Sequence, residues 1–476
     1  MTKNVNDTIY AVATPPGRSA IAVIRISGEY AEKTPALFSV TCPAAGHFKV
    51  SRLLQAGKVL DQVVLLFMKG PHSNTGEDVC EIHCHGSRAV IDAIMAQLDR
   101  ASELRLAAPG EFTRRSFLNG KTDLSGVEGL ADLIDAQTPA QLHQAWAQID
   151  GALKAPVMAW RGELIRIAAR LEALIDFNDE DLPPVIEQTL RESTKALIST
   201  LAKNLADGGV GEIVRDGVVV ALVGPVNVGK STILNGLAGR AAAIVSDEAG
   251  TTRDIIQIQL DLHGVPITIL DTAGIRDTSG AIEMEGIKRS VKAAANADLI
   301  LVILDGSDKC WPDACDKIEK AIDHEISESS ANQKIVSGKV VNERQRLYVL
   351  NKADRGTIHA NYRIECNDKH SDTNNTLAIS AKKQMDLNLL SKVLARRLAP
   401  LNHAEGSVII TRQRHRQSMQ SAHDALVRAL TYDFQQAPEL AAEDFRLAVG
   451  ALGRITGEID VEELLGSIFS AFCIGK

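Results

Sequence analysis

The sequence of residues 224–231 is Gly224-Pro225-Val226-Asn227-Val228-Gly229-Lys230-Ser231, between an apolar run at 218–223 and an expected helix from residue 232. A strand, a glycine loop, Lys-Ser and a helix in this order predict a phosphate-binding loop. Gly224 and Gly229 let main-chain N–H groups turn toward phosphate oxygens. We expect Lys230 to neutralise the β- and γ-phosphates and Ser231 to ligate magnesium. The alternative is a glycine turn before an ordinary helix, and the strand-loop-helix context favours the phosphate loop.

Three further motifs follow predicted strands in the same part of the chain. Asp271-Thr272-Ala273-Gly274 ends the apolar run 267–270, where Asp271 can hold magnesium through a water and the Gly274 N–H can reach the γ-phosphate. Asn351-Lys352-Ala353-Asp354 follows the run 347–350, and the Asp354 carboxylate can accept the N1 and N2 hydrogens of guanine. Ser380-Ala381-Lys382 follows the run 376–379, where main-chain N–H groups can meet the guanine O6. The order of these motifs predicts a GTP site rather than an ATP site.

The expected hydrolytic apparatus differs from that of Ras-like switches. Ile275 stands where those switches place a water-orienting Gln, so we expect Glu283 to orient the water, its alternative role being an exposed cap. Thr252 is the expected second magnesium ligand, and the Asn227 side chain could hold a monovalent cation. The expected GTP-binding residues are Asn227, Val228, Gly229, Lys230, Ser231, Thr232, Ser246, Thr251, Thr252, Asp271, Gly274, Asn351, Lys352, Asp354, Ser380, Ala381 and Lys382.

Composition narrows the class of protein. The chain has 476 residues, 45% hydrophobic and 24% charged, which is ordinary for a soluble multidomain protein. A net charge of −8 argues against electrostatic coating of nucleic acid, and 4% aromatic residues argue against base stacking. Neither a run of about 18 apolar residues nor an apolar N-terminal signal core occurs, so we expect a cytoplasmic protein with no membrane contact.

The cysteines do not suggest a disulfide framework. There are seven of them, an odd number, and they are scattered along the chain. One cluster, Cys80-Glu81-Ile82-His83-Cys84-His85, has two interpretations: metal ligands, or a strand whose alternate residues are small and polar. No second ligand pair is evident, and a closed structural zinc site needs one, which favours the strand.

Changes of sequence pattern along the chain predict its domains. Strand and helix signals alternate over residues 1–121, with Arg25 facing away from Ile24 and Ile26 on a strand. Residues 122–215 carry the helical period, broken by Pro183 and Pro184. We expect a parallel sheet wrapped by helices in residues 216–398, with strands at 218–223, 267–270, 299–304, 347–350 and 376–379. Residues 325–346 and 367–375 are expected to be exposed insertions. The helical period returns in residues 399–476, so the nucleotide domain is expected to interrupt a helical bundle.

The sequence as a whole resembles the tRNA-modification GTPase family MnmE, also called TrmE. Gly250-Thr251-Thr252-Arg253-Asp254, Asp271 to Gly274 with Ile275, and Glu283 before Gly286 are similar to the GTPase of that family. More specific are three motifs outside the GTPase segment, which general GTPases lack: Thr75-Gly76-Glu77-Asp78, Pro109-Gly110-Glu111-Phe112-Thr113 and the terminal Cys473-Ile474-Gly475-Lys476.

The resemblance implies a fold, cofactors and partners. It implies an N-terminal α/β domain, similar to folate-binding domains, that forms a homodimer and holds a 5-formyl-tetrahydrofolate-type cofactor. Magnesium and potassium accompany GTP, and a flavin-dependent partner, MnmG (GidA), acts with it on the wobble uridine (U34) of tRNA to install a 5-carboxymethylaminomethyl or aminomethyl group. The implied residues are Arg25, Glu81, Lys121 and Lys476 for folate; Asn227, Ser246, Glu248 and Thr251 for potassium; Glu283 for catalysis; and Cys473 as a possible reactive thiol.

One alternative function remains at the level of sequence. A ribosome-assembly or regulatory GTPase switch would share the nucleotide motifs but would have no use for a one-carbon-folate pocket. The chain also departs from the family at Val226, Asn74 and Ser87, which affects the geometry of the phosphate loop and the folate pocket. Because the chain is acidic, tRNA contact is expected through the partner or a local patch such as Arg412, Arg414 and Arg416.

Overall fold

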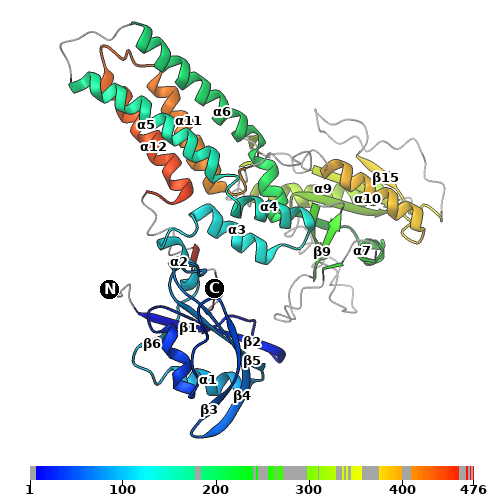
Figure 1. The fold of residues 1–476 in the computed structure, drawn as a ribbon. Coiled ribbons are helices and arrows are strands. Elements are labelled where there is room, and N and C mark those ends of the chain that lie inside the picture. Colours follow the sequence, from blue (N-terminus) through cyan, green and yellow to red (C-terminus); the bar gives the residue numbers. More distant parts are fainter. Residues whose placement is uncertain are drawn as a thin grey trace. The chain divides into compact units, whose positions relative to one another are not determined.

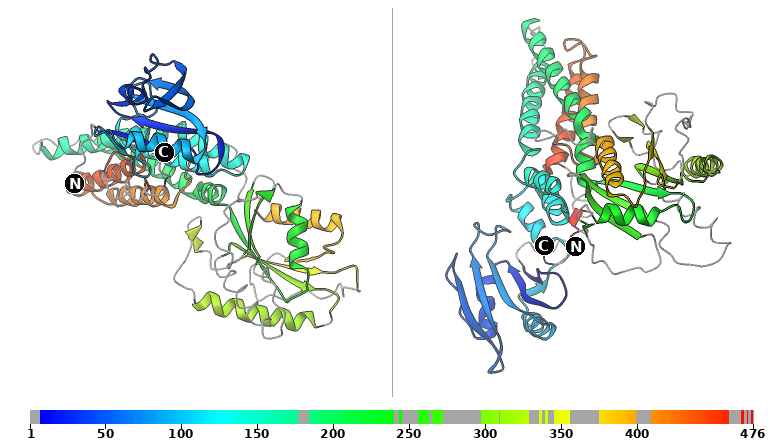
Figure 2. Two further views of the ribbon diagram at one scale, coloured as in Figure 1. Left: turned by 90° about the horizontal axis from the view of Figure 1, so that it is seen from below. Right: turned by 90° about the vertical axis from the view of Figure 1, so that its right-hand side faces the viewer.

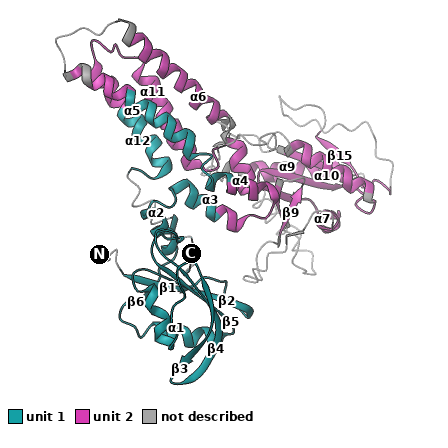
Figure 3. Cartoon of the chain, in the orientation of Figure 1, with its two compact units in different colours: residues 1–131, 147–166, 446–476 teal, residues 132–146, 167–445 magenta. Residues whose placement is uncertain are grey.

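The computed structural model of the chain forms two compact units (Figure 3). Unit 1 comprises residues 1–131, 147–166 and 446–476, and unit 2 comprises residues 132–146 and 167–445. The structure describes residues 7–176, 184–239, 243–244, 256–262, 265–271, 297–308, 310–328, 335–336, 339–340, 345–355, 375–398, 409–459, 468–469, 472 and 475.

Unit 1 contains a six-stranded sheet in the order β3-β4-β5-β2-β1-β6 (Figure 1). β1 and β6 pair in parallel, whereas the other neighbours are antiparallel. The strands are β1 (Thr8–Val12), β2 (Ser19–Ser27), β3 (Phe48–Gln55), β4 (Lys58–Met68), β5 (Val79–Gly86) and β6 (Leu104–Leu106).

Side-chain alternation gives this sheet two different faces. Ile24 and Ile26 of β2 are fully buried in a core that includes residues of the 3₁₀ helix η1 (Ala31–Phe38) and the helix α1 (Arg88–Leu98). Ile9 and Ala11 of β1 instead pack with Phe112 of α2 (Glu111–Leu118). Arg25 lies over the Phe112 ring, with its guanidinium carbon 5.7 Å from the ring centroid. The predicted alternation around Arg25 is therefore confirmed.

Long helices occupy the segments where the sequence predicts them. The predicted break at Pro183-Pro184 is confirmed, since α5 ends at Asp176 and α6 begins at Pro184, where the first helical turn tolerates proline. Within unit 2, α6 and α11 lie side by side (Figures 1 and 2), and Arg191 of α6 donates to the Leu430 and Tyr432 carbonyls beyond the end of α11. The helices are α3 (Leu124–Asp135), α4 (Pro139–Ile149), α5 (Lys154–Asp176), α6 (Pro184–Asp216), α11 (Gln413–Ala429) and α12 (Pro438–Thr456).

Unit 2 also contains a seven-stranded sheet in the order β15-β14-β11-β7-β10-β9-β8. The five strands from β15 to β10 are parallel, as predicted. Two strands that were not predicted extend the sheet beyond β10: β9 runs antiparallel to β10, and β8 runs antiparallel to β9. Leu262 of β9 pairs with Val265 of β10 only three residues later, and two strands joined by so short a segment must run antiparallel. The strands are β7 (Val218–Val223), β8 (Ala243–Ile244), β9 (Ile256–Leu262), β10 (Val265–Asp271), β11 (Leu299–Asp305), β14 (Gln345–Asn351) and β15 (Thr376–Ala378).

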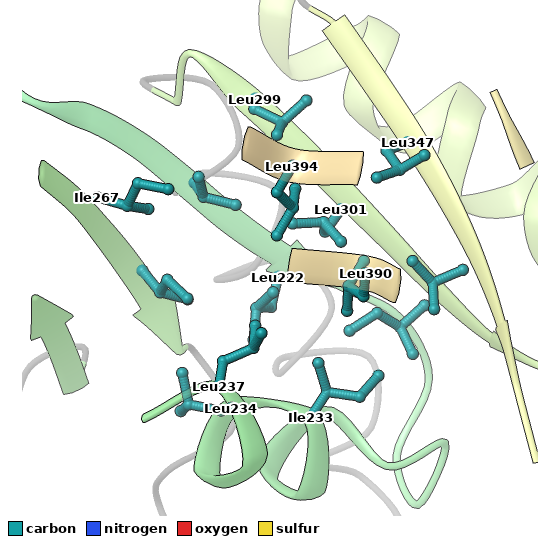
Figure 4. Close-up of a cluster of buried hydrophobic side chains, with 14 of the residues drawn as sticks. Leu222, Ile233, Leu234, Leu237, Ile267, Leu299, Leu301, Leu347, Leu390 and Leu394 are labelled. Carbon is teal, nitrogen blue, oxygen red and sulfur yellow. The ribbon is translucent and has the colours of Figure 1, made fainter. Parts of the chain in front are cut away.

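Helices cover both faces of this sheet (Figure 2). One face packs against α7 (Lys230–Ala238) and α10 (Gln384–Leu398), in the core that Figure 4 shows around Leu222, Leu301 and Leu390. The other face packs against α9 (Trp311–Glu328) through Cys315, Ile318 and Ile322. Burial on both faces explains why the central strands are continuous apolar runs rather than alternating ones.

The prediction that residues 325–346 form an exposed insertion is wrong at both ends. α9 continues to Glu328, and β14 already begins at Gln345. Arg346 is mostly buried and pairs with Glu319 and Asp323 of α9, so its charge is used within the fold. Between these ends the described residues form two short paired strands, β12 (Ile335–Val336) and β13 (Lys339–Val340).

Candidate functional site

The phosphate-binding loop connects β7 to α7, as the sequence predicts. Gly229 has φ +99°, and a Cβ there would lie 2.3 Å from Nδ2 of Asn351. A Cβ on Gly224 would lie 2.1 Å from the Ile303 carbonyl oxygen. Both glycines are therefore required, because the loop passes too close to neighbouring strand ends for any side chain.

Lys230 is the first residue of α7, and its side chain turns back into the loop. It is 6% exposed, and its ammonium donates to the carbonyls of Gly224 and Pro225, both at 2.7 Å. Ser231 and Thr232 follow on the same helical turn, and both are exposed. A buried positive charge, a helix N-terminus and a nearby hydroxyl thus come together at one loop, a combination suited to phosphate and its metal ion.

Asn351 connects the phosphate loop to the loop after β15. Its Nδ2 donates to the Val228 carbonyl at 2.7 Å, and its Oδ1 accepts from the Ala381 N–H at 2.9 Å. Asn351 is 2% exposed, so both bonds are made away from water. The structure thereby brings together three of the predicted motifs, those at 224–231, 351–354 and 380–382.

Two of the amides predicted to meet guanine already have partners. The Ser380 N–H donates to the Asp386 carboxylate at 2.7 Å, and the Ala381 N–H donates to Asn351. A bond from Ala381 to a guanine oxygen would thus be shared with the Asn351 side chain. Asp386 was missed by sequence reasoning, although an acidic residue in the first turn of α10 is a usual signal for such a bond.

Lys352 and Asp354 lie at the open edge of this motif. Lys352 adopts the left-handed conformation, with φ 63°, and its ammonium pairs with Asp305 at 2.6 Å. Asp354 is exposed, and its pKa lies below the ordinary value, chiefly because of the Ser380 side chain. Asp354 is therefore an anion available to a polar ligand. Asp305, the last residue of β11, was missed, and its position at a strand end was the signal for it.

Several predicted residues lie outside the part of the chain that the structure describes. For Asp271, the structure gives only its backbone position at the end of β10, beside β7 in the sheet. That position matches the prediction of a strand-end aspartate. The predicted residues outside the described ranges are Ser246, Glu248, Thr251, Thr252, Gly274, Glu283, Cys473 and Lys476.

In unit 1, two of the residues implied for folate contact each other. Arg25 of β2 and Glu81 of β5 are register neighbours, and Arg25 Nε lies 2.8 Å from Glu81 Oε1. His83, two residues along the same strand, contacts the second carboxylate oxygen at 3.0 Å. Burial would raise the pKa of Glu81, but the charge of Arg25 and hydrogen bonds from Arg25 and His83 outweigh it, so the pKa is lowered. Glu81 is therefore an anion at neutral pH.

The remaining folate candidates are placed differently. Lys121 does not join the Arg25–Glu81 pair through any contact in the described part of the chain; its ammonium donates to the Pro71 carbonyl at 2.8 Å. Lys121 also lies beside Gly76, the turn residue of the Thr75-to-Asp78 motif. His83 was missed as a neighbour of Glu81, although residues two apart on a strand share a face.

The family-specific motifs of unit 1 form one hydrogen-bonded network. Thr75 and Glu77 both bond the Ser27 hydroxyl at 2.7 Å, and Glu77 also pairs with Arg115 at 3.0 Å. Glu111 of the Pro109-to-Thr113 motif binds the same Arg115 at 3.3 Å, and it also binds Arg105. These residues hold the end of β2 and the start of α2, the two elements that carry Arg25 and Phe112.

The C-terminal segment packs on the same unit. Phe469 is buried with Leu124 and Val127, and a Cβ on Gly110 would lie 2.7 Å from its carbonyl oxygen. Gly475, with φ +102°, comes so close to β1 that a Cβ would lie 2.1 Å from the Val12 carbonyl oxygen. Gly475 thus reaches β1, the strand that pairs with the strand carrying Arg25.

The Cys80-to-His85 cluster is a strand, the interpretation that the sequence favours. Cys80 and Cys84 are buried in the sheet core, whereas His85 is exposed and contacts Asp61 at 2.7 Å. Among the described residues, no group of three or more His, Cys, Asp or Glu side chains is arranged to hold a metal ion.

The suggested basic patch at Arg412, Arg414 and Arg416 is not a free cationic surface. Arg412 pairs with Asp132 at 2.5 Å and Arg416 with Glu212 at 2.6 Å, and both arginine side chains are largely buried. Their sequence spacing gave no indication of these acidic partners, which are distant in the chain.

Two family descriptions match the chain in succession. Residues 8–121 match "GTP-binding protein TrmE N-terminus", and residues 124–473 match "MnmE helical domain". The tRNA modification GTPase MnmE of Parvibaculum lavamentivorans is 44% identical over 99% of this chain and 100% of its own length. That of Paramagnetospirillum magneticum is 43% identical over the same shares. The solved structure of an Aquifex aeolicus Era variant bound to GDP and AlF4⁻ is 22% identical, covering 45% of this chain and 68% of its own, with a TM-score of 0.25.

A glycine loop carrying a buried lysine, tied through Asn351 to a guanine-type motif, defines a GTPase of the P-loop class. The chain belongs to the MnmE (TrmE) family of tRNA modification GTPases. No helix in the described ranges combines the length and apolar character needed to cross a bilayer.

Proposed function

We propose that this GTPase is the GTP-hydrolysing subunit of a complex that modifies the wobble uridine, U34, of tRNA. It would install the 5-carboxymethylaminomethyl or aminomethyl group with a carbon unit carried by a folate. The observation that carries this proposal is the Arg25–Glu81 pair in unit 1, on the strand next to the one that Gly475 approaches. A GTPase that acted only as a switch would not need this arrangement.

The residues present fit a folate-type ligand. A pterin ring offers a flat face with amide-like donors and acceptors, and a glutamate tail offers carboxylates. Glu81 supplies a mostly buried anion, and Arg25 keeps its donors beside the flat ring of Phe112. Gly475, the residue before Lys476 in the chain, closely approaches β1. A bound folate would supply the one-carbon group, and Arg25, Glu81, Lys121 and Lys476 would bind and orient it.

The proposed GTP site would also take magnesium and a monovalent cation. Ser231 and Thr252 would hold magnesium, and Asn227, Ser246, Glu248 and Thr251 would hold potassium. Asn227 lies on the phosphate loop with an exposed side chain and φ 61°, so its amide oxygen can reach a ligand outside the loop. Glu283 would orient the attacking water, since Ile275 has no group for that task. Gly274, Lys352, Asp354 and Lys382 would complete the GTP contacts.

The proposed organisation follows from these roles. Residues 1–121 would bind folate and form the homodimer, residues 216–398 would hydrolyse GTP, and residues 122–215 with 399–476 would form the helical domain. The flavin-dependent protein MnmG would be the partner, and tRNA the macromolecular substrate, in the cytoplasm. Cys473 is proposed as a reactive thiol.

Titration calorimetry with 5-formyl-tetrahydrofolate tests the folate site. We expect saturable binding to the whole protein and its loss in Arg25→Ala, because removing Arg25 takes away the cation paired with the mostly buried Glu81 carboxylate and leaves only His83 beside it. Arg18→Ala is the matched control, since Arg18 is an exposed arginine just before the same strand. Absence of binding to the unaltered protein would remove the support for the one-carbon role.

Mass analysis of tRNA nucleosides tests the function as a whole. Cells that lack this protein should lose the modified wobble uridine, and the unaltered gene should restore it. If the Arg25→Ala variant restores the modified wobble uridine to its normal level in these cells, the Arg25–Glu81 site does not serve the modification. Normal wobble uridine in the deficient cells, together with a defect in ribosome assembly, would favour a GTPase switch instead.

A further inference from the structure

The chain leaves α6 and enters the seven-stranded sheet with almost no linker. α6 ends at Asp216, and β7 begins at Val218. Gly217 between them has φ +74°, donates its N–H to the Ile213 carbonyl at 2.8 Å, and leaves room for no Cβ because the Pro266 oxygen would lie 2.8 Å away. Ile213 packs against the core of that sheet. The helix is thus joined directly to the strand that leads into the phosphate loop.

The returning chain meets the same helix end. Residues 409–412 follow the sheet, and both Ile410 and Thr411 are buried. The Thr411 carbonyl accepts from Arg215 at 3.2 Å. The next residue, Arg412, donates to Asp132 Oδ1 at 2.5 Å, and Arg215 Nε lies 3.8 Å from that same oxygen. The Asp132 carboxylate of α3 therefore contacts Arg215, where the chain enters the sheet from α6, and Arg412, where the chain returns from the sheet.

Neighbouring contacts extend this junction to α4. Gln141 and Gln144, on one side of α4, donate their amides to the carbonyls of Arg215 and Gly211 at 2.9 and 3.1 Å. One turn earlier in α6, Glu212 pairs with Arg416 at 2.6 Å. The last four carbonyls of a helix, here including that of Arg215, lack partners within the helix, so the Gln141 amide that bonds the Arg215 carbonyl fixes the helix end.

We infer that Asp132, Arg215 and Arg412 act as one joint that transmits the nucleotide state of the phosphate loop to α3 and α4. We name these three residues the root triad. A domain inserted through two free linkers would rearrange without moving the helices. Here β7 continues into α6, and the triad binds α6 to α3 and to the returning chain. Asp132 is therefore a positioning residue that acts through α6, and it does not touch the nucleotide.

Hydrogen exchange on the full-length protein tests the joint directly. In the unaltered protein, amides of residues 132–146 should exchange at different rates when it is loaded with GDP and with a non-hydrolysable GTP analogue. Asp132→Asn should abolish that difference and speed exchange in residues 211–217 and 409–416. Asp135→Asn is the matched control, because Asp135 is an exposed carboxylate on the same helix. No nucleotide-dependent difference in the unaltered protein would overturn the inference.

Kinetics separates positioning from general loss of structure. Asp132→Asn should leave KM and kcat for GTP within about twofold, while tRNA modification per GTP hydrolysed falls about tenfold, within the usual range of coupling between sites. Asp132→Glu should restore most of the coupling. The double variant Asp132→Asn/Arg412→Gln should be no worse than either single variant, because the triad acts as one unit. Parallel loss of kcat and nucleotide affinity would show a merely structural role.

Only the tRNA readout rests on the proposed function. If the unaltered protein modifies no tRNA, the proposed function fails, and the exchange experiment still decides whether the joint transmits the nucleotide state. If the Asp132→Asn variant modifies tRNA at the normal level and its amides exchange as in the unaltered protein, the joint is refuted and the proposed function stands.

Discussion

Replacing Gly229 by alanine should disable nucleotide binding through the geometry of Asn351. Alanine in the left-handed region costs about 1–2 kcal/mol. Its Cβ would also lie 2.3 Å from Asn351 Nδ2, which forces the buried amide to move. The bonds from Asn351 to Val228 and from Ala381 to Asn351 would be broken, and each buried group left unpaired costs about 1–3 kcal/mol. Because about 1.4 kcal/mol is a tenfold change in affinity, GTP should bind about 100-fold more weakly or worse.

Fluorescence titration with a labelled GDP measures this loss, and thermal unfolding reports the cost to the fold. Gly239→Ala is the matched control at the other end of α7, because Gly239 has a negative φ and its Cβ would lie 3.3 Å from the nearest atom, a distance that a small shift relieves. Asn351→Ala should weaken binding similarly without the backbone strain. If Gly229→Ala binds GDP as tightly as the unaltered protein, the close approach of Asn351 does not constrain the loop.

Three further perturbations test separate residues. The pKa of Glu81 is lower in the folded protein than the unfolded value near 4.5. The ionised Glu81 therefore stabilises the fold above that unfolded pKa, and this stabilisation is lost as the pH falls through the folded pKa. Glu81→Gln should flatten this part of a plot of the free energy of urea unfolding against pH. GTP hydrolysis should be at least about tenfold faster in potassium than in sodium, because a well-placed positive charge at the phosphates can speed hydrolysis by about 10³- to 10⁵-fold. Asn227→Ala should equalise the two salts, and equal rates before the substitution contradict a potassium site. Glu283→Ala should abolish single-turnover hydrolysis with GDP affinity unchanged, and weaker GDP binding would instead indicate a structural role.

The sequence was sufficient for features that depend on local pattern. The glycine loop before Lys230, the apolar strands around it and the alternation about Arg25 all follow from periodicity and turn chemistry, and the structure confirms them. The antiparallel β9 was missed because no short turn motif such as Asn-Gly marks its hairpin. Arg346 was taken for an exposed residue because its acidic partners on α9 are distant in sequence. Which charged residues pair over long distances in the chain depends on the tertiary fold, and the local sequence pattern does not show it.

Asn351 shows how a correctly predicted residue can have an additional role. From sequence, the Asn351-Lys352-Ala353-Asp354 motif selects the base, and the loop at 224–231 holds the phosphates. In the structure the Asn351 side chain bonds the phosphate loop on one side and the Ala381 amide on the other. The loop that would read guanine and the loop that would hold phosphate are thus connected by one buried amide. A change in either must be accommodated by the other, and β7 carries that change toward Gly217 and the end of α6.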